Sequence, residues 1–263
     1  AKAINNFLLT VQHDLEGLSA LLVRSGEPIN LDLAYTEIKH FHALHPELYN
    51  VTLIRPDGKV LLTARNPPGT TNATLAEESS FKEFLKVVEK GQNIDIGQPL
   101  VAVVSKTAIV PVRLAIRDQR GQPLYILSAN LPHEYLRSFW KDAPITSKAA
   151  IGLMRDNGFL LARYPVPSKL SLDQVYGRPR TGALINHLQA AGFPSIGIIQ
   201  GPSSLDGPDF LNAFRRLDNY PATLFVAMPM TEVWIEWWKR MISTYLALIF
   251  LVVGGIAARL YSL

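Results

Sequence analysis

The first apolar residues of the chain recur at intervals of three and four positions. They are Ile4, Phe7, Leu8, Val11, Leu15, Leu18 and Leu22. This spacing places them on one side of an α-helix, which we expect to end near Ser25 and Gly26. The same kind of pattern predicts a second helix over residues 31–44 and a third over residues 79–90, just before Gly91.

Short strands separated by turn residues follow the second helix. The segments NVTLI and KVLLTA flank the turn residues Pro56, Asp57 and Gly58, a pattern that predicts a β-hairpin. Further strands are expected over residues 100–104, 108–116 and 124–131. The order of helix, hairpin, helix and three-stranded meander is typical of an α+β fold.

The same order recurs in the second half of the chain. Residues 123–140 match residues 221–238, and shorter identities occur 100 positions apart upstream. The matched pairs include Arg55 and Arg155, Gly58 and Gly158, Pro123 and Pro221, Ala129 and Ala227, Glu134 and Glu232, and Trp140 and Trp238. Chance similarity between amphipathic segments is the alternative. Because the identities lie near both ends of the unit, two copies of one module are the simpler interpretation.

The repeat divides the chain into four segments. We expect an N-terminal helical stalk over residues 1–45, a membrane-distal module over 46–140, a membrane-proximal module over 141–240 and a transmembrane helix over 241–263. Each module is expected to contain a five-stranded antiparallel sheet. The chain opens without Met and without a signal-peptide pattern, which predicts that it is a piece of a longer protein.

The last segment has the composition of a membrane span. Residues 242–258 carry no charge, and three tryptophans precede them together with Lys239 and Arg240, as in an interfacial belt. A buried core helix is the alternative. Lys239 and Arg240 stand at one end of the span and Arg259 at the other, so the charges alone do not fix its orientation.

Composition excludes several classes of function. Of the 263 residues, 48% are hydrophobic and 18% charged, which excludes disorder over most of the chain. The net charge of +4 is scattered, which argues against nucleic-acid binding. The chain has no cysteine, so it has no disulfide, thiolate nucleophile or Cys-ligated metal.

The sequence contains no familiar catalytic or metal-binding motif. The chain lacks Gly-x-Ser-x-Gly, His-Glu-x-x-His and Gly-x-x-x-x-Gly-Lys patterns, so we predict no catalytic residue and no cofactor. His40, His42 and His45 form a dense cluster. On a helix His40 is rotated away from the other two, which favours a partly exposed helix end over a metal site.

Several motifs resemble those of the double Cache family, the tandem PAS-like sensor domains of bacterial transmembrane receptors. In the second half these are RDNGFLLARYP from Arg155, SSLDG from Ser203 and FRRLDNYP from Phe214; in the first half, LIRPDGKVL and IGQP follow the same plan. The resemblance covers nearly the whole chain. It is similar to the sensor domains that precede diguanylate cyclases and sensor kinases.

The resemblance implies a location and a mode of action. It implies sensor modules in the periplasm, anchored in the bacterial inner membrane, with a small-molecule ligand in the first module. A cytoplasmic diguanylate cyclase, phosphodiesterase or histidine kinase would be the output domain. We further expect the apolar stripe of the first helix to pair two chains into a homodimer, so that a ligand-linked shift changes helix packing at the membrane.

The chain departs from the family at positions that bind ligands. Glu78, Ser79, Ser80 and Phe81 stand where many relatives carry an Asp-Arg pair ahead of an aromatic residue. Asn130 stands where amino-acid-binding relatives place an aspartate that holds the ligand's ammonium group. A neutral amide cannot supply this charge-assisted pairing, so an ordinary α-amino acid is disfavoured as a ligand.

Five residues are candidates for ligand binding: Phe81, Arg113, Tyr125, Ser128 and Asn130. Strand alternation places Ser128 and Asn130 on one face of the last strand and Tyr125 on the other, without showing which face is internal. Arg113 suits a carboxylate or phosphate, but a solvent-facing arginine is the reading that we favour. Phe81 and Tyr125 could instead belong to the core, the reading that we favour for Phe84.

Two other classes of function remain open at this point. The chain could be a scaffold that binds a protein partner or sets dimer geometry without a small ligand, which the loss of the family's charged pocket residues supports. A membrane-anchored extracytoplasmic enzyme would require a catalytic constellation, and the sequence shows none.

Overall fold

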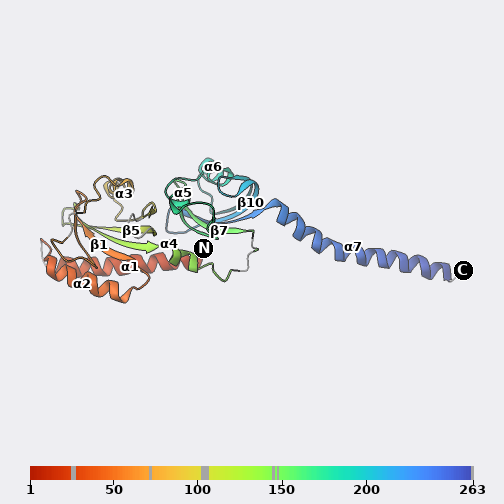
Figure 1. Cartoon of the computed structure of the whole chain (residues 1–263), viewed down its shortest axis with the longest axis horizontal. Helices are drawn as coiled ribbons and strands as arrows, with labels where there is room; N and C mark the ends of the chain where they lie inside the picture. Colours follow the sequence, from red (N-terminus) through yellow and green to blue (C-terminus); the bar gives the residue numbers. More distant parts are fainter. Residues whose placement is uncertain (25–27, 71–72, 102–106, 144–145, 147, 262–263) are drawn as a thin grey trace.

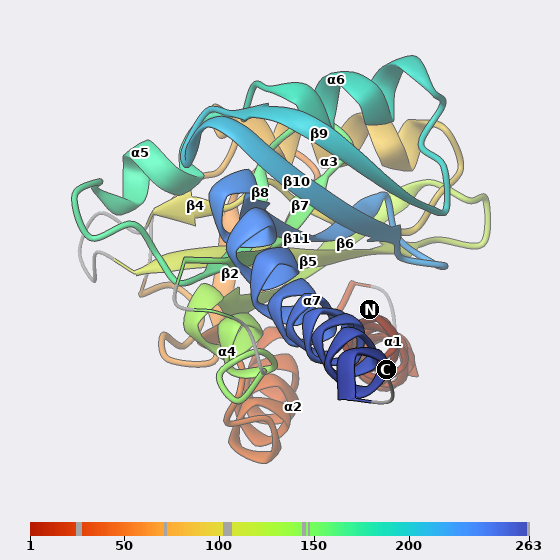
Figure 2. The ribbon, with the colours of Figure 1, turned by 90° about the vertical axis from the view of Figure 1, so that its right-hand side faces the viewer.

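Two antiparallel sheets lie one after the other along the length of the molecule, and a long helix extends from the second (Figure 1). The computed structural model describes the chain except residues 25–27, 71–72, 102–106, 144–145, 147 and 262–263. Helices α3 (Ser79–Glu89), α5 (Leu172–Tyr176) and α6 (Ala183–Ala190) lie on one side of the sheets, while α1 (Lys2–Arg24) and α2 (Leu31–Leu44) lie on the other (Figure 2). This arrangement confirms the α+β class and the two PAS-like modules in tandem.

The predicted helices form close to their expected bounds. The helices are α1 (Lys2–Arg24), α2 (Leu31–Leu44), α3 (Ser79–Glu89), α4 (His133–Ser138), α5 (Leu172–Tyr176), α6 (Ala183–Ala190) and α7 (Met230–Tyr261). Asn30 caps α2 by accepting hydrogen bonds from two backbone amides, and Glu78 caps α3 in the same way. Gly91, with φ of +87°, follows α3 as the sequence predicts.

The first sheet contains β1 (Asn50–Ile54), β2 (Val60–Thr63), β3 (Ile94–Ile96), β4 (Leu100–Val101), β5 (Ala108–Arg117) and β6 (Pro123–Pro132). The second contains β7 (Ala150–Arg155), β8 (Leu160–Tyr164), β9 (Ile196–Ser203), β10 (Gly207–Arg216) and β11 (Ala222–Pro229). Of the strand expected over residues 100–104, β4 forms the first part, and residues 102–104 lie outside the described residues.

The two sheets have the same strand order, which explains the sequence repeat. The order is β2-β1-β6-β5-β3 in the first sheet and β8-β7-β11-β10-β9 in the second. The first sheet departs from the expected five strands because the short β4 also pairs with β5. Each sheet places its last strand in the centre, beside the first strand of its hairpin.

Helix α1 packs inside its own chain. Its stripe from Ile4 to Leu22 is buried in one cluster with residues of both sheets, including Val112 of the first and Leu153 of the second. Asn5 also donates a hydrogen bond of 3.0 Å to Asn219 of the second module. The expectation that this stripe pairs two chains is therefore wrong, because the stripe is already buried against the sheets of its own chain.

Helix α7 continues directly from the second sheet. It begins at Met230, immediately after β11 ends at Pro229, and runs through residue 240, where the sequence placed a domain boundary. Its most apolar 18-residue window has a mean hydropathy of 2.2, and no residue of α7 is buried. The helix is long and apolar enough to cross a membrane, and the alternative of a buried core helix is excluded (Figures 1 and 2).

Candidate ligand-binding site

A row of polar side chains crosses the first sheet on the face toward α3. The strand register aligns Thr63, Thr52, Ser128, Arg113 and Asp95 across β2, β1, β6, β5 and β3. Paired residues of antiparallel strands share a face, and all five are buried. The face is identified by Ile126, two residues before Ser128, which clusters with Phe81 and Phe84 of α3. Buried polar groups in such a row need partners, from the protein or from a ligand.

Arg113, at the centre of this polar row, is buried. Its side chain is 1% exposed. One terminal nitrogen donates a hydrogen bond of 2.7 Å to Ser80 Oγ, and the other donates one of 3.0 Å to Glu78 Oε2. The third nitrogen, Nε, has no partner among the described residues. The solvent-facing arginine that we favoured from the sequence is therefore wrong.

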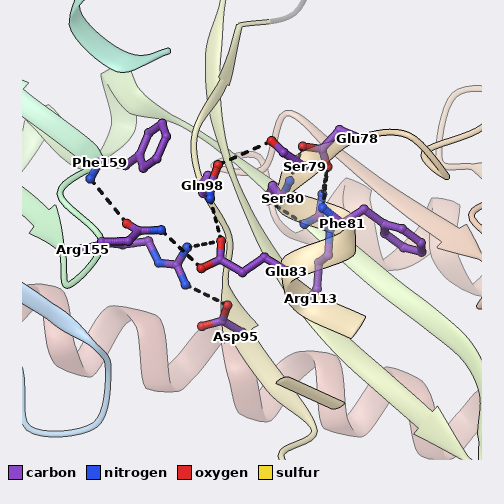
Figure 3. Close-up of polar contacts among 11 residues, drawn as sticks. Glu78, Ser79, Ser80, Phe81, Glu83, Asp95, Gln98, Arg113, Arg155 and Phe159 are labelled. Carbon is purple, nitrogen blue, oxygen red and sulfur yellow. Dashed lines mark hydrogen bonds and ion pairs between the residues drawn. The ribbon is translucent and has the colours of Figure 1, made fainter. Parts of the chain in front are cut away.

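Glu78 joins Arg113 to the start of α3. Its carboxylate accepts hydrogen bonds from the backbone amides of Ser80 and Phe81 at 2.6 and 2.8 Å, besides the bond from Arg113. Burial lowers the pKa of the Arg113 guanidinium, and Glu78 acts against this shift. Glu78 thus occupies the part of Arg113 that would hold a ligand carboxylate (Figure 3).

The structure brings four of the five predicted residues together. Ser128 Oγ donates a hydrogen bond of 3.3 Å to Asn130 Oδ1, and the Phe81 ring lies 5.6 Å from the Arg113 guanidinium. Tyr125 lies on the opposite face, where it packs against the core that contains α1. Asn50, paired with Asn130 across the strands, has a buried and unpartnered Oδ1 among the described residues. Phe81 and Phe84 both belong to the buried hydrophobic cluster under α3, the reading that the sequence favours for Phe84 and leaves open for Phe81.

One arginine of the second module reaches into the first. Arg155, at the end of β7, places one terminal nitrogen 2.9 Å from Glu83 Oε2 of α3 and the other 3.0 Å from Asp95 Oδ2 of β3 (Figure 3). Asn157 and Gln98 donate further hydrogen bonds to Glu83, at 3.2 and 2.8 Å. The two modules are thus joined by an inter-module network built around Arg155.

Asp95 belongs both to the polar row and to this network. Burial raises the pKa of its carboxyl group, and the nearby Arg155 guanidinium opposes that rise. Asp95 lies opposite Arg113 in the strand register, where the Arg113 charge lowers its pKa, and it forms an ion pair with Arg155 across the modules. A change at the polar row therefore has a direct electrostatic route to the second module.

Sequence reasoning did not find Glu83, Asp95 or Arg155. The repeat contained one usable signal, because it aligned Arg155 with Arg55. The structure separates the two roles: Arg55 forms a half-exposed ion pair with Asp57 in its own turn, while the Arg155 side chain is 6% exposed. In the sequence, Asp57 follows Arg55 by two residues, whereas Asn157 stands at the equivalent place after Arg155. This difference indicates that Arg155 has its acidic partner elsewhere in the chain.

A buried histidine forms a second contact between the modules. The ring of His133 in α4 lies 4.8 Å from that of Tyr176 in α5, and its Nδ1 is 2.9 Å from the carbonyl oxygen of Ala108. Burial lowers the pKa of His133 below its usual 6.5. This side of the module interface therefore favours the neutral imidazole.

The histidine cluster near residue 42 has structural partners. His42 Nε2 lies 3.1 Å from the carbonyl oxygen of Leu48, and His45 pairs with Glu47 at 2.9 Å. His40 is exposed. Among the residues that the structure describes, no three His, Asp or Glu side chains are placed to hold a metal ion.

The arrangement of two such sheets along a long first helix is found in sensory domains of bacterial receptors. The chain matches the extracellular domain of a histidine kinase with a TM-score of 0.69 and 16% identity, covering 88% of this chain and 90% of that one. The periplasmic sensory domain of the Campylobacter jejuni chemoreceptor Tlp1 matches with a TM-score of 0.65 and 16% identity, covering 89% and 92%. The fold expected from the double Cache resemblance is confirmed.

Some similar structures were solved with ligands. The ligand-binding domain of the Pseudomonas aeruginosa amino-acid chemoreceptor PctB, in complex with L-Arg, matches with a TM-score of 0.59 and 15% identity, covering 88% of this chain and 90% of that one. No family model matches the sequence, and no curated protein does either. At these identities the likeness establishes the fold of a sensory domain.

Proposed function

We propose that this chain is the ligand-sensing part of a bacterial receptor, with both modules in the periplasm and α7 in the inner membrane. Ligand binding in the first module is passed through the second module and α7 to a cytoplasmic output domain, a cyclic-dinucleotide enzyme or a histidine kinase. The observation that carries this proposal is the unbroken passage from β11 into α7 at Pro229 and Met230. Any shift of β11 is thereby applied to the start of the membrane helix.

The proposed ligand site is the polar row beside α3. Ser128, Asn130 and the unpaired Nε of Arg113 present hydrogen-bonding groups on one buried face, with Phe81 beside them. Glu78 and Ser80 already accept hydrogen bonds from the two terminal nitrogens of Arg113. A ligand carboxylate at that place must therefore displace Glu78, which also caps α3. Binding then moves the start of α3, and with it Glu83 of the inter-module network.

The membrane topology can be tested with cysteine labelling, because the chain has no native cysteine. Ser168→Cys lies on the exposed surface of the second module, and Leu260→Cys lies near the far end of α7. In spheroplasts a membrane-impermeant maleimide should label Ser168→Cys, and should label Leu260→Cys only after permeabilisation. Equal labelling of both variants without permeabilisation would contradict a membrane-spanning α7.

The ligand site can be tested by thermal-shift screening of small polar metabolites on the detergent-solubilised chain. A ligand of the proposed site should lose its effect in Asn130→Ala. Tyr125→Ala is the matched control on the same strand, because Tyr125 lies on the opposite face of the sheet. A ligand whose affinity survives Asn130→Ala and Arg113→Ala, or falls equally in Tyr125→Ala, would place binding elsewhere.

The pairing of Arg113 with Glu78 also favours a second candidate function. Glu78 of the same chain already accepts a hydrogen bond from Arg113, so Arg113 has less need of a ligand carboxylate. This fits a scaffold that recognises a protein, or that sets the geometry of a homodimer, without a small ligand. Light scattering of the solubilised chain measures the oligomeric state. A screen without hits, combined with a defined cross-linked protein partner, would support the scaffold over the sensor.

A further inference from the structure

The second module contains a cavity between its sheet and α6. It has a volume of about 40 Å³. Because a water molecule needs roughly 10–15 Å³ by this measure, the cavity has room for about three waters, the size of a molecule with two or three carbons. Part of its wall is apolar and is formed by Met154, Leu160, Leu184, Ile185 and Phe225. Such a wall suits a short carbon chain.

The polar part of the wall contains a buried arginine with one free donor. Arg163 is 4% exposed, and its terminal nitrogens donate to the carbonyl oxygen of Pro165 at 2.5 Å and to the carboxylate of Asp206. Its Nε is buried without a partner among the described residues. A buried donor without an acceptor is unfavourable, and a bound acceptor relieves that cost.

The charges around the cavity do not balance. Arg180 also lines it, and the hydrogen bonds of its guanidinium go to the carbonyl oxygen of Arg178. Asp206, the one carboxylate in the wall, is already bound to Arg163 and to Ser203. Two guanidiniums therefore face one carboxylate, which leaves a positive excess that favours an anion.

The start of α6 adds to this positive character. Gly182, the N-cap of α6, lines the cavity and supplies no side-chain cap to the first backbone amides of the helix. A helix N-terminus carries partial positive charge and free N–H donors, which favour an anion. Gly182 has φ of +131°, and a Cβ there would lie 2.6 Å from the carbonyl oxygen of Pro202. A glycine is thus required where α6 starts beside the cavity.

We propose that this cavity is a second binding site, which takes a monocarboxylate of two or three carbons. The carboxylate binds Arg180 and the free Nε of Arg163 near the start of α6, and the carbon chain lies against Leu184 and Met154. The site is separate from the polar row of the first module and needs no ligand there. Because it lies in the module that continues into α7, its occupancy acts on the sheet nearest the membrane.

The test is calorimetric titration of the full chain in detergent micelles with propionate. Propionate should bind saturably, while propionamide, which has the same shape without the charge, should bind at least tenfold more weakly. Arg180→Gln should weaken propionate binding at least tenfold. The matched control is Arg178→Gln, two residues away on an exposed side chain outside the cavity, and it should leave the affinity within twofold.

Further variants separate this site from the first one. Leu184→Trp fills the cavity and should abolish propionate binding, whereas Asn130→Ala in the first module should leave it unchanged. The proposal is overturned if neither acetate nor propionate binds at millimolar concentration, if propionamide binds as well as propionate, or if Arg178→Gln weakens binding as much as Arg180→Gln. Loss of binding in Asn130→Ala would place the carboxylate in the first module instead.

Discussion

Replacing Arg155 by methionine should destabilise the folded chain strongly, because it removes the only cation that the structure shows between Glu83 and Asp95 in the inter-module network. Both side chains of the Arg155–Asp95 pair are 6% exposed, while Glu83 is 32% exposed. Removing one partner of a buried ion pair costs about 3–5 kcal/mol, since it leaves the other charge buried and uncompensated. We expect a loss near the lower end, about 3 kcal/mol, because water reaches Glu83.

The repeat supplies the matched control for this prediction. Arg55 occupies the equivalent place in the first module, but its side chain and that of Asp57 are about half exposed. An exposed ion pair contributes about 0–1 kcal/mol, so Arg55→Met should have little effect. Urea unfolding of the two variants in the same detergent, followed by circular dichroism, measures the difference. Equal losses, or a loss below about 1 kcal/mol for Arg155→Met, would refute the reasoning.

The pH dependence of the same variant tests the role of Asp95. Burial raises the pKa of Asp95 above its usual 3.8 in the folded chain, and loss of Arg155 should raise it further. A carboxyl group whose pKa is raised in the folded chain favours folding while it is protonated. This contribution to stability is present at low pH and is lost as pH rises through the folded pKa. The deficit of Arg155→Met should therefore be largest at neutral pH and shrink toward pH 4. A deficit independent of pH would show that Asp95 is not the uncompensated charge.

Three further predictions concern the module interface, α1 and α7. Because burial lowers the pKa of His133, the stability of the wild-type chain should fall as pH drops from 6.5 through the folded pKa. Urea unfolding of His133→Gln should not show this pH dependence, and the same pH profile in both proteins would contradict the role of His133. Leu15→Ala should cost about 2–5 kcal/mol, against under about 0.5 for the half-exposed Leu21→Ala, in the same assay; equal costs would place the stripe outside the core. Val252→Arg should cost about 2.5–3.5 kcal/mol of membrane insertion and release chain on carbonate extraction, whereas Leu260→Arg near the helix end should not. Retention of Val252→Arg would refute the expected insertion cost, and release of the unsubstituted chain would exclude a spanning α7.

Most of the fold could be predicted because its signals are periodic and local. The bounds of α2 were predicted at Leu31–Leu44, and α3 begins at Ser79 as expected. The repeat predicted two equal modules, and the shared strand order confirms them. The strand β3 was not predicted, and the strands of the second module were predicted only as a repeat of the first. The strand β3 is three residues long, and half of β9 is exposed at the edge of its sheet. Edge strands carry a weak hydrophobic pattern.

The partners of polar residues could not be predicted, because they depend on contacts distant in the sequence. Arg113 reads as a charge that interrupts an apolar strand, and only the fold shows Glu78 in front of it. The stripe of α1 reads equally well as a dimer surface or as core, since periodicity shows that a face is buried without showing what covers it. The structure decides this by placing both sheets against the stripe.

The proposed ligand site and the proposed route to the membrane meet at one side chain. Asp95 ends the polar row and binds Arg155, and Arg155 pairs with Ala222 at the start of β11. The strand β11 leads without interruption into α7. A ligand that draws Asp95 or Glu83 away from Arg155 therefore changes the ion pair that fixes β7 and β11 against the first module. Transmission requires two states that bind the ligand with different affinity, and we propose that the Arg155 network is paired in one of these states and released in the other.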